Sequence, residues 1–223
     1  MALRIRNAIA LSRAIAPLQA EPPNATAQLL LVGNRTAVGT GASAVGASVG
    51  GLIAHQHPRA RIVNRACVGA KFADIVRQLE PPQRFDLILI LGGGNGVIRL
   101  TGNAALQADV GRALQLASER ADTVVLMPAG KFGNTPFFPQ PLAWLMHQRS
   151  LKLHAIARHA AASANAIYVN GYKETHEDPF ARHARRLNAA DGLHPSDDGY
   201  QLWFSALQDQ AALSQGLAAV AGQ

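Results

Sequence analysis

The hydrophobic positions of the chain form five short apolar runs that alternate with longer segments of helical spacing. The runs cover residues 28–33, 60–64, 85–92, 123–128 and 166–170. The segments of helical spacing cover residues 43–56, 71–80, 101–120, 142–164 and 196–219. Continuous apolar runs separated by helices predict parallel strands that are buried on both faces, because each right-handed crossover lays a helix against the sheet. We therefore expect an α/β fold with a three-layer α/β/α arrangement, a doubly wound, flavodoxin-like sheet of about five parallel strands.

Residues 1–25 precede this pattern and are expected to form a helical extension. Apolar residues at spacings of three and four predict an apolar stripe along one helix. These residues are Ile5, Ile9, Leu11, Ile15 and Leu18. A basic start and a small-residue end are also typical of a secretory signal, although Arg13 interrupts the apolar stretch. The sequence favours a cytoplasmic chain and leaves a periplasmic or secreted one open.

The length and composition set limits on the class of protein. A chain of 223 residues that is 48% hydrophobic is most simply one domain over residues 1–223. No apolar run reaches the roughly 18 residues that span a bilayer, so stable membrane insertion is not expected. The single cysteine, Cys67, excludes an intramolecular disulfide and a cysteine-based zinc site, and we expect it to be buried beside a strand. The histidines show no metal-ligand pattern, with His55 and His57 as a surface pair at a helix end, and no cofactor is expected.

The net charge of +7 lies entirely in the first third of the chain. Residues 1–73 carry eight Lys or Arg and one acid, whereas residues 74–223 carry thirteen of each. This excess is suited to nucleic acid, anionic lipid or an acidic ligand. Only 5% of residues are aromatic, and no basic run is interleaved with them, so nucleic-acid binding is disfavoured. The sequence leaves the oligomeric state open.

Glycine-rich turns follow the first three predicted strands, at the ends where ligands bind in such sheets. Their sequences are "GNRTAVGTGAS", "RACVGAKF" and "GGGNGVIRLT". The first contains the G-x-G-x-x-A pattern of a dinucleotide-binding turn, but no acidic residue lies between Glu21 and Asp74 to hold a ribose. A phosphate loop that ends in Gly-Lys-Ser/Thr is also missing. The glycines are therefore better explained by tight turns and close helix packing than by nucleotide binding.

The stretch "AADGLHPSDDGYQLW", residues 189–203, contains a candidate acid–histidine pair just before the last predicted helix. A separation of three positions on a turn allows the carboxylate of Asp191 to accept the Nδ1 proton of His194. That hydrogen bond would fix the tautomer and raise the basicity of Nε2. An ordinary surface pair, with Ser196 or Asp197 as a helix cap, is the simpler alternative.

Taken together and in order, these stretches resemble the SGNH or GDSL family of ester hydrolases over nearly the full chain. The family carries a Gly-Asp-Ser turn, a glycine, a Gly-x-Asn-Asp turn and a terminal Asp-x-x-His pair. The matching positions are Gly33, Gly69, Gly93 to Asn95, Asp191 and His194. The stretch "FFPQPLAWL", residues 137–145, is similar to a bacterial esterase and lipase branch. The resemblance implies an SGNH-hydrolase fold, a catalytic pair of Asp191 and His194, and an oxyanion hole that includes Gly69 and Asn95.

The chain departs from the family pattern inside these motifs. Asn34 stands where the family has Asp, Arg35 where it has the nucleophilic serine, and Gly96 where it has Asp. A guanidinium carries no nucleophilic oxygen and stays protonated at any accessible pH. Thr36 offers the nearest hydroxyl, but a shift of one residue along a tight turn redirects the side chain. A water activated by His194 is the remaining nucleophile.

Two hypotheses about function follow from the resemblance. In the first, the chain is a catalytically silent or strongly impaired family member that binds an anionic or acyl ligand. Arg35 then pairs with Asp191, or joins Asn95 and the Gly69 amide in an anion cradle, or merely fills the site or points to solvent. In the second, the chain is an active ester hydrolase that uses Asp191 and His194 without a serine. The expected partner in both cases is a small-molecule ester or an anionic or acyl ligand.

Overall fold

The computed structural model describes residues 2–13, 15–215 and 217, and its centre is a single sheet of five parallel strands. The strands stand in the order β2-β1-β3-β4-β5. Their bounds are β1 Ala27–Gly33, β2 Ala60–Asn64, β3 Phe85–Gly92, β4 Ala121–Pro128 and β5 Ile167–Tyr168. In register, Leu31 of β1 is paired with Leu89 of β3, and Leu89 with Val125 of β4. The predicted parallel α/β sheet is confirmed.

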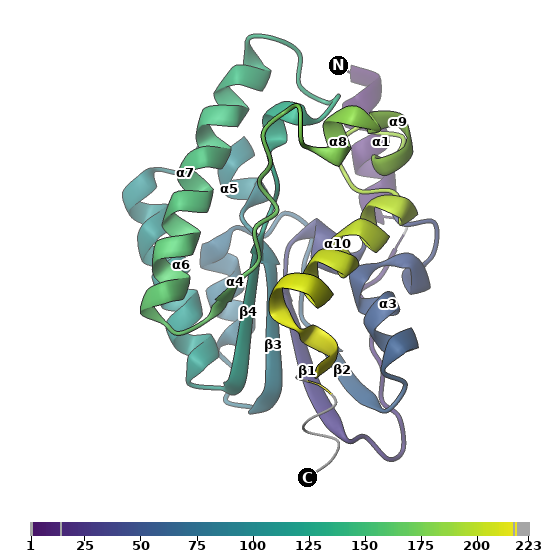
Figure 1. Ribbon diagram of the computed structural model, residues 1–223, viewed down its shortest axis with the longest axis vertical. Helices are drawn as coiled ribbons and strands as arrows, with labels where there is room; N and C mark the ends of the chain where they lie inside the picture. The colour runs from purple at the N-terminus through teal and green to yellow at the C-terminus, as the bar shows by residue number, and fades with distance from the viewer. Residues whose placement is uncertain (1, 14, 216, 218–223) are drawn as a thin grey trace.

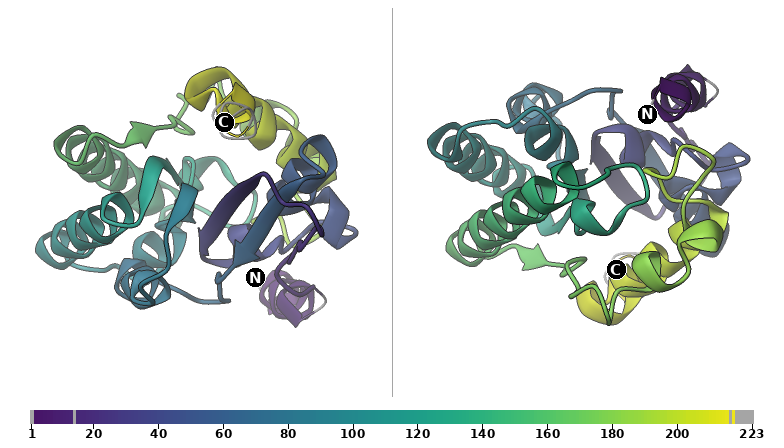
Figure 2. Two further views of the ribbon diagram at one scale, coloured as in Figure 1. Left: turned by 90° about the horizontal axis from the view of Figure 1, so that it is seen from below. Right: turned by 90° about the horizontal axis from the view of Figure 1, so that it is seen from above.

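Helices cover both faces of this sheet, as Figures 1 and 2 show. One layer contains α4, α6 and α7, and the other contains α3 and α10. The helix bounds are α1 Ala2–Arg13, α2 Arg35–Val38, α3 Val49–Gln56, α4 Phe72–Leu79, α5 Gly94–Ile98, α6 Asn103–Ser118, α7 Leu142–Ser163, α8 Pro179–Arg182, α9 Ala184–Leu187 and α10 Asp197–Ala211. Two 3₁₀ turns are η1 Val45–Ala47 and η2 Phe132–Asn134.

The core lies on both sides of the sheet because alternate strand residues point to opposite faces. Leu30 and Val32 of β1 pack with the α4, α6 and α7 layer. Leu29 and Leu31 pack with α3 and α10. Each of these four side chains is fully buried. The continuous apolar runs in the sequence thus correspond to strands that have no solvent-exposed face.

The order of the strands places a crevice between the carboxyl ends of β1 and β3. The chain leaves β1 through α3 on one face to reach β2, and then returns through α4 on the other face to reach β3. The two connections leave toward opposite faces of the sheet, so a crevice remains between them at the carboxyl ends of β1 and β3. Ligands of open α/β sheets bind at such switch points.

Three predicted segments have different bounds in the structure. The fifth strand was expected over residues 166–170 but is only Ile167–Tyr168, an edge strand that pairs on one side with β4. The expected helix at 43–56 is divided, because the Ser48 side chain caps a new helix at Val49. The closing helix was expected over residues 196–219. Its counterpart α10 ends at Ala211, because Ala212 has a left-handed backbone conformation. Residues 216, 218 and 219 lie outside the described part of the chain.

The predicted apolar stripe along the first helix is wrong. The helix ends at Arg13, so Ile15 and Leu18 lie beyond it and pack in the core cluster on the α3 side. Ile9 is 45% exposed, and Ala8 is buried instead. The side chain of Ile5 lies outside the described residues. The segment after the helix continues to Ala20, which bridges to Ile62 of β2, and this pairing explains why the helical spacing does not persist.

Cys67 was expected to be buried but is exposed. It lies in the turn after β2, where its amide donates to the Gly33 carbonyl over 3.2 Å. The side chain consequently points away from the core, and Gln78 donates to its Sγ over 3.5 Å. Of the expected histidine pair, His55 is exposed, and His57 bonds Ser214 over 2.9 Å. No helix in the described part of the chain is long and apolar enough to cross a membrane.

Gly33 provides a test of how closely the first turn approaches β3. Its φ is +150°, and a Cβ at this position would lie 2.0 Å from the Leu91 carbonyl oxygen. We expect Gly33→Ala to lower the free energy of unfolding by more than about 2 kcal/mol, measured by urea denaturation. Gly111→Ala is the matched control, because a Cβ there meets nothing within 4 Å on an exposed stretch of α6. The control should stabilise the chain by up to about 1 kcal/mol, and equal effects of both variants would contradict the close approach.

His154 of α7 is buried between two hydrogen-bond partners. Its Nε2 lies 2.8 Å from the Ala129 carbonyl oxygen, and its Nδ1 lies 2.5 Å from the Tyr168 hydroxyl. Because a carbonyl only accepts, Nε2 carries the proton and Nδ1 accepts from the tyrosine. Burial lowers the pKa of His154 to about 4, an effect that the Ala129 carbonyl opposes and the Arg158 charge assists.

This lowered pKa predicts a loss of stability in mild acid. The unfolded chain takes up a proton on this imidazole near pH 6.5, whereas the folded chain does so only near pH 4. The contribution is therefore complete above pH 6.5 and is lost as the pH falls from 6.5 toward 4. The free energy of unfolding, measured by urea denaturation, should fall between pH 7.5 and pH 4.5. The fall should be larger by roughly 2 to 3 kcal/mol in the wild type than in His154→Gln. Equal pH dependence in both proteins would refute this assignment.

Candidate active site

The turn after β1 is held tightly against β3. The Asn34 amide donates to the Leu91 carbonyl over 3.1 Å, which places residues 34–36 beside the end of β3. Asn34 then caps α2, because its Oδ1 accepts from the Thr36 amide over 3.2 Å and from the Thr36 hydroxyl over 2.8 Å. Gly39 ends this short helix at a φ of +100°. The Thr36 hydroxyl therefore faces back toward its own turn.

The turns after β2 and β3 are joined by one side chain. Asn95, in the first turn of α5, donates from Nδ2 to the Ala70 carbonyl over 3.0 Å. Gly69 immediately precedes this carbonyl residue and has a φ of +86°, in the left-handed region that favours glycine. A Cβ on Gly69 would lie 3.4 Å from Nη2 of Arg99, so this arginine reaches across from the end of α5 to the second turn.

Asp191 and His194 form a buried pair at the start of α10. Nδ1 of His194 lies 2.5 Å from Oδ2 of Asp191. The other carboxylate oxygen accepts from the amides of Leu193 and His194 over 2.9 and 3.0 Å. Burial by itself would raise the pKa of Asp191, but the hydrogen bonds from the His194 side chain and these two amides outweigh it and lower the pKa. The carboxylate thus stays charged and orients the imidazole, with the proton on Nδ1.

Two further contacts fix this pair against the first turn. A Cβ on Gly41 would lie 2.4 Å from the Pro195 carbonyl oxygen, so only a glycine lets the loop after α2 pass so close to His194. The buried Tyr200 of α10 donates its hydroxyl to the Thr40 carbonyl over 2.8 Å. The glycine-rich stretch after β1 therefore serves as the packing surface for the segment that carries Asp191 and His194.

These segments surround a cleft of about 740 Å³, which includes space open to solvent. Its walls come from residues 34–36, from α5, from the loops at 129–135 and 171–188, and from residues 193–195 with Trp203. Of the residues singled out in the sequence, Asn34, Arg35, Asn95 and His194 line the cleft. Asp191 lies behind His194, fully buried. Gly69 is not among the lining residues.

The Arg35 side chain is partly buried at the wall of this cleft and has no ionic partner. Within the described part of the chain, no carboxylate lies within 4.0 Å of its guanidinium, so the expected pair with Asp191 is absent. Its Nε is buried without a hydrogen-bond partner. Burial lowers the pKa of Arg35, the charge of Arg99 lowers it further, and the charge of Asp191 raises it.

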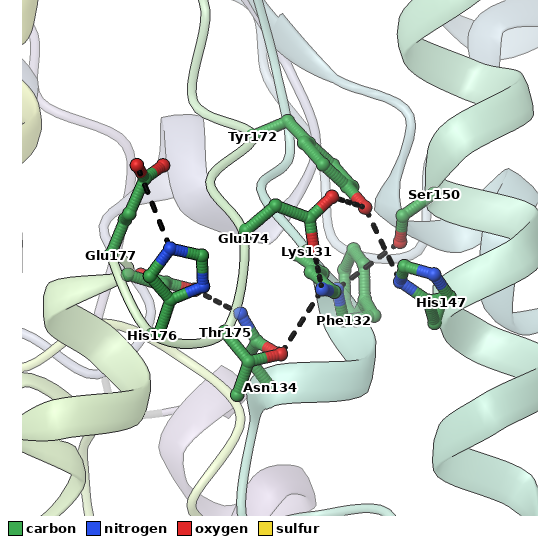
Figure 3. Close-up of polar contacts among 11 residues, drawn as sticks. Lys131, Phe132, Asn134, His147, Ser150, Tyr172, Glu174, Thr175, His176 and Glu177 are labelled. Atoms are coloured by element: carbon green, nitrogen blue, oxygen red, sulfur yellow. Dashed lines mark hydrogen bonds and ion pairs between the residues drawn. The ribbon is translucent and has the colours of Figure 1, made fainter.

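A second polar group on the cleft wall was not found from the sequence (Figure 3). The ammonium group of Lys131, a buried residue, contacts Glu174 at 2.9 Å and the Thr175 hydroxyl at 3.1 Å, and lies over the Tyr172 ring. Tyr172 bonds His147 over 3.3 Å, and its pKa is raised to about 12 by burial and by Glu174. Lys131 lies in the loop after β4, and Tyr172 and Glu174 lie in the loop after β5. The pairing within them joins residues 43 positions apart, which no local pattern reveals.

Metal-ligand clusters of three or more His, Cys, Asp or Glu side chains do not occur among the residues that the structure describes. The groups that converge on the cleft are the imidazole of His194, the side chains of Arg35 and Asn95, the carboxylate of Asp178, and apolar side chains. An oriented imidazole next to amide donors can accept a proton and stabilise a developing oxyanion. This combination is the chemistry of acyl transfer.

Comparison with solved structures supports the fold. The acetylxylan esterase Axe2 from Geobacillus stearothermophilus is 19% identical with a TM-score of 0.60, covering 84% of this chain and 94% of that one. The lipase/acylhydrolase from Enterococcus faecalis is 20% identical with a TM-score of 0.60, covering 88% and 96%. A member of the lipolytic protein G-D-S-L family from Veillonella parvula is 15% identical with a TM-score of 0.64, covering 82% and 96%.

No curated protein matches the sequence. The model of the GDSL-like Lipase/Acylhydrolase family matches residues 10–202, which include all five strands and every residue named at the cleft except Trp203. The sheet order, the cleft at the ends of β1 and β3, and this match lead to one assignment. The chain belongs to the GDSL-like lipase/acylhydrolase family of SGNH hydrolases.

Proposed function

We propose that this chain is a catalytically silent or strongly impaired member of the family, in which Arg35 occupies the position of the nucleophilic serine. The observation that carries the proposal is the placement of Arg35. It follows Gly33 and Asn34 in the turn after β1, and it lines the same cleft as His194. A guanidinium provides neither a nucleophilic oxygen nor a proton that His194 can remove.

The remaining groups of an ester hydrolase are supported by their geometry. We assign His194 as the base and Asp191 as the residue that orients it, on the basis of the 2.5 Å hydrogen bond between them. Asn95 has a second Nδ2 proton beyond the one that it gives to Ala70, and it lines the cleft. We assign Asn95 as an oxyanion donor, whereas the Gly69 amide, expected as its companion, belongs to a residue that does not line the cleft. In this proposal an inherited acyl-transfer site retains its acid–histidine pair and the Asn95 donor but not its nucleophile.

Thr36 is a poor substitute for the missing serine. Its hydroxyl proton is directed at Asn34 Oδ1 over 2.8 Å, and this hydrogen bond is part of the cap that begins α2. To attack a substrate, Thr36 would have to break this contact and reach His194 from one position further along the turn. The cap favours the present rotamer.

The alternative is an active ester hydrolase that uses water as the nucleophile. The hydrogen bond from Nδ1 to Asp191 keeps Nε2 of His194 free to accept a proton. Water would attack the ester carbonyl while Nε2 takes its proton, and the imidazolium would return that proton to the departing alcohol oxygen. Arg35 would then act as an oxyanion donor. This route forgoes the covalent acyl intermediate and is expected to be slow.

We also infer that residues 1–223 form one domain, with residues 1–25 as a helical extension. Support comes from the single sheet that collects strands from residues 27–168, and from the packing of α10 against α3 on that sheet. The expected ligand is a small-molecule ester or an anionic or acyl compound that enters the cleft.

Hydrolysis of p-nitrophenyl acetate and butyrate separates the two functions. We expect the wild-type chain to release p-nitrophenol no faster than about 10³- to 10⁴-fold above the uncatalysed rate. This is the residual rate enhancement that remains when a serine hydrolase loses its nucleophile. His194→Ala should change this rate little. A faster wild-type rate that His194→Ala abolishes would establish the water-based hydrolase instead.

Restoring the family residues tests whether Arg35 occupies the serine position. We expect Asn34→Asp with Arg35→Ser to raise the rate at least about 100-fold, because a hydroxyl would then face the oriented imidazole. The matched control is Asn34→Asp with Arg35→Ala, which removes the arginine without adding a hydroxyl. Adding His194→Ala to the serine variant should abolish the gain. A gain in both double variants would show that only the bulk or charge of Arg35 limits the reaction.

A further inference from the structure

Two side chains of opposite charge line the cleft, and neither has an ionic partner among the residues that the structure describes. We propose that the cleft binds a zwitterionic amino acid, with its ammonium group at Asp178 and its carboxylate at Arg35. This inference rests on the proposed function only in taking the cleft as the ligand site. It adds the chemical class of the ligand and a role for Asp178, which the sequence did not single out.

The first support is the charge balance of the cleft wall. In the described part of the chain, neither Arg35 nor Asp178 has an oppositely charged group within 4.0 Å. The other cation of the wall, Lys131, is paired with Glu174 at 2.9 Å (Figure 3). The imidazole of His194 already has its own buried carboxylate as a partner. One positive and one negative charge therefore remain, and a ligand that carries one of each satisfies both.

The second support is the way in which Asp178 is held. The residue is only 5% exposed, yet both of its printed side-chain donors are neutral. Its Oδ2 accepts from Nδ2 of Asn134 over 2.6 Å, and its Oδ1 accepts from the Phe180 amide over 2.9 Å. A carboxylate has about four acceptor positions, so about two remain open. A cationic donor is the partner that compensates a buried carboxylate best.

A second acceptor on the cleft wall also has no donor. Asn188 is 6% exposed, and its Oδ1 is buried without a hydrogen-bond partner. Its Nδ2 donates to the Ala184 carbonyl over 2.9 Å, which fixes the orientation of the amide, because the reverse orientation would place Oδ1 against that carbonyl. Asp178 directly precedes α8, and Asn188 directly follows α9. An ammonium group has three N–H donors to offer to these oxygens.

The third support is the aromatic surface of the same wall. Phe180, whose amide holds Asp178, lines the cleft together with Trp203. The centroids of these two rings are 6.3 Å apart, at an interplanar angle of 62°. Phe132 adds a third ring to the lining. Ring faces attract ammonium groups, so a cation carried on carbon fits this wall better than an inorganic ion.

A ligand with a single charge would leave one of the two wall charges unpaired. A simple amine would not reach Arg35, whose Nε is buried without a partner. A simple carboxylate would leave Asp178 with neutral donors alone. The two side chains do not neutralise each other, because their charged atoms lie more than 4.0 Å apart. A planar carboxylate suits the guanidinium, and an ammonium on the same molecule suits the acid.

Isothermal titration calorimetry with a series of amino acids tests the proposal on the full chain. The series consists of glycine, 4-aminobutanoate and 6-aminohexanoate, and each is compared with the carboxylic acid and the alkylamine of the same carbon number. We expect at least one amino acid to bind at least about tenfold more tightly than both of its matched compounds, because only the amino acid pairs both charges. The member that binds most tightly measures the separation of the two charged groups.

Two charge-removing variants should have complementary effects. Asp178→Asn keeps a side-chain cap for α8, and it should weaken the tightest amino acid about tenfold or more without weakening the matched carboxylic acid. Arg35→Gln should weaken that amino acid by a similar factor without weakening the matched amine. The matched controls are Asp122→Asn and Arg59→Gln, because both residues are exposed at the opposite end of the sheet, at the starts of β4 and β2. Both controls should bind like the wild type.

The outcomes separate this inference from the proposed function. The inference is overturned if no amino acid binds more tightly than both matched compounds, or if a folded Asp178→Asn binds it like the wild type. An equal loss of all three compounds in Asp178→Asn also overturns it, because that result indicates a structural role alone. Far-ultraviolet circular dichroism confirms that each variant is folded.

Hydrolysis of p-nitrophenyl acetate is measured on the same preparations. Turnover that depends on His194 contradicts catalytic silence and leaves the amino-acid binding result standing. Absence of both turnover and amino-acid binding contradicts this inference alone.

Discussion

The structure depends on one constraint, that its central sheet is buried on both faces. Leu29 to Val32 of β1 and Ile88 to Leu91 of β3 are fully enclosed by helices, so no polar side chain can project from the middle of these strands without losing its water. Polar chemistry is thereby confined to the strand ends. The close approach of Gly33 to the Leu91 carbonyl brings the ends of β1 and β3 together, and the cleft forms where the crossovers diverge.

The same constraint explains why the pair at the start of α10 is built as it is. Asp191 is fully buried, and an ionised carboxylate there requires compensation from several donors. The His194 ring and two backbone amides supply them, so the carboxylate and the imidazole tautomer are determined together. Removing one partner would leave a buried charge without compensation, so the packing of this segment favours the pair whether or not the site is active.

The sequence predicted those features that local pattern and chain order determine. The strands at 60–64 and 85–92 have the predicted bounds, since their apolar runs end sharply at polar residues or glycine. The contact of Asp191 with His194 also follows from local spacing. The short fifth strand, the exposed Cys67 and the end of the first helix at Arg13 could not be predicted, because edge pairing and turn packing decide them. The pairing of Lys131 with Glu174 depends on two loops that meet only in the fold.

Arg35 is the residue at which local rules and the fold disagree. A side chain that merely filled an abandoned site would lower the free energy most if it were apolar, or paired with an acid. Arg35 is neither: its Nε is buried without a partner, and burial and the charge of Arg99 both lower its pKa. An unsatisfied buried donor costs about 1 to 3 kcal/mol, and such departures concentrate at functional sites. An unpartnered and partly desolvated cation costs more free energy than an apolar side chain of similar size, which argues against Arg35 as an inert filling of the cleft.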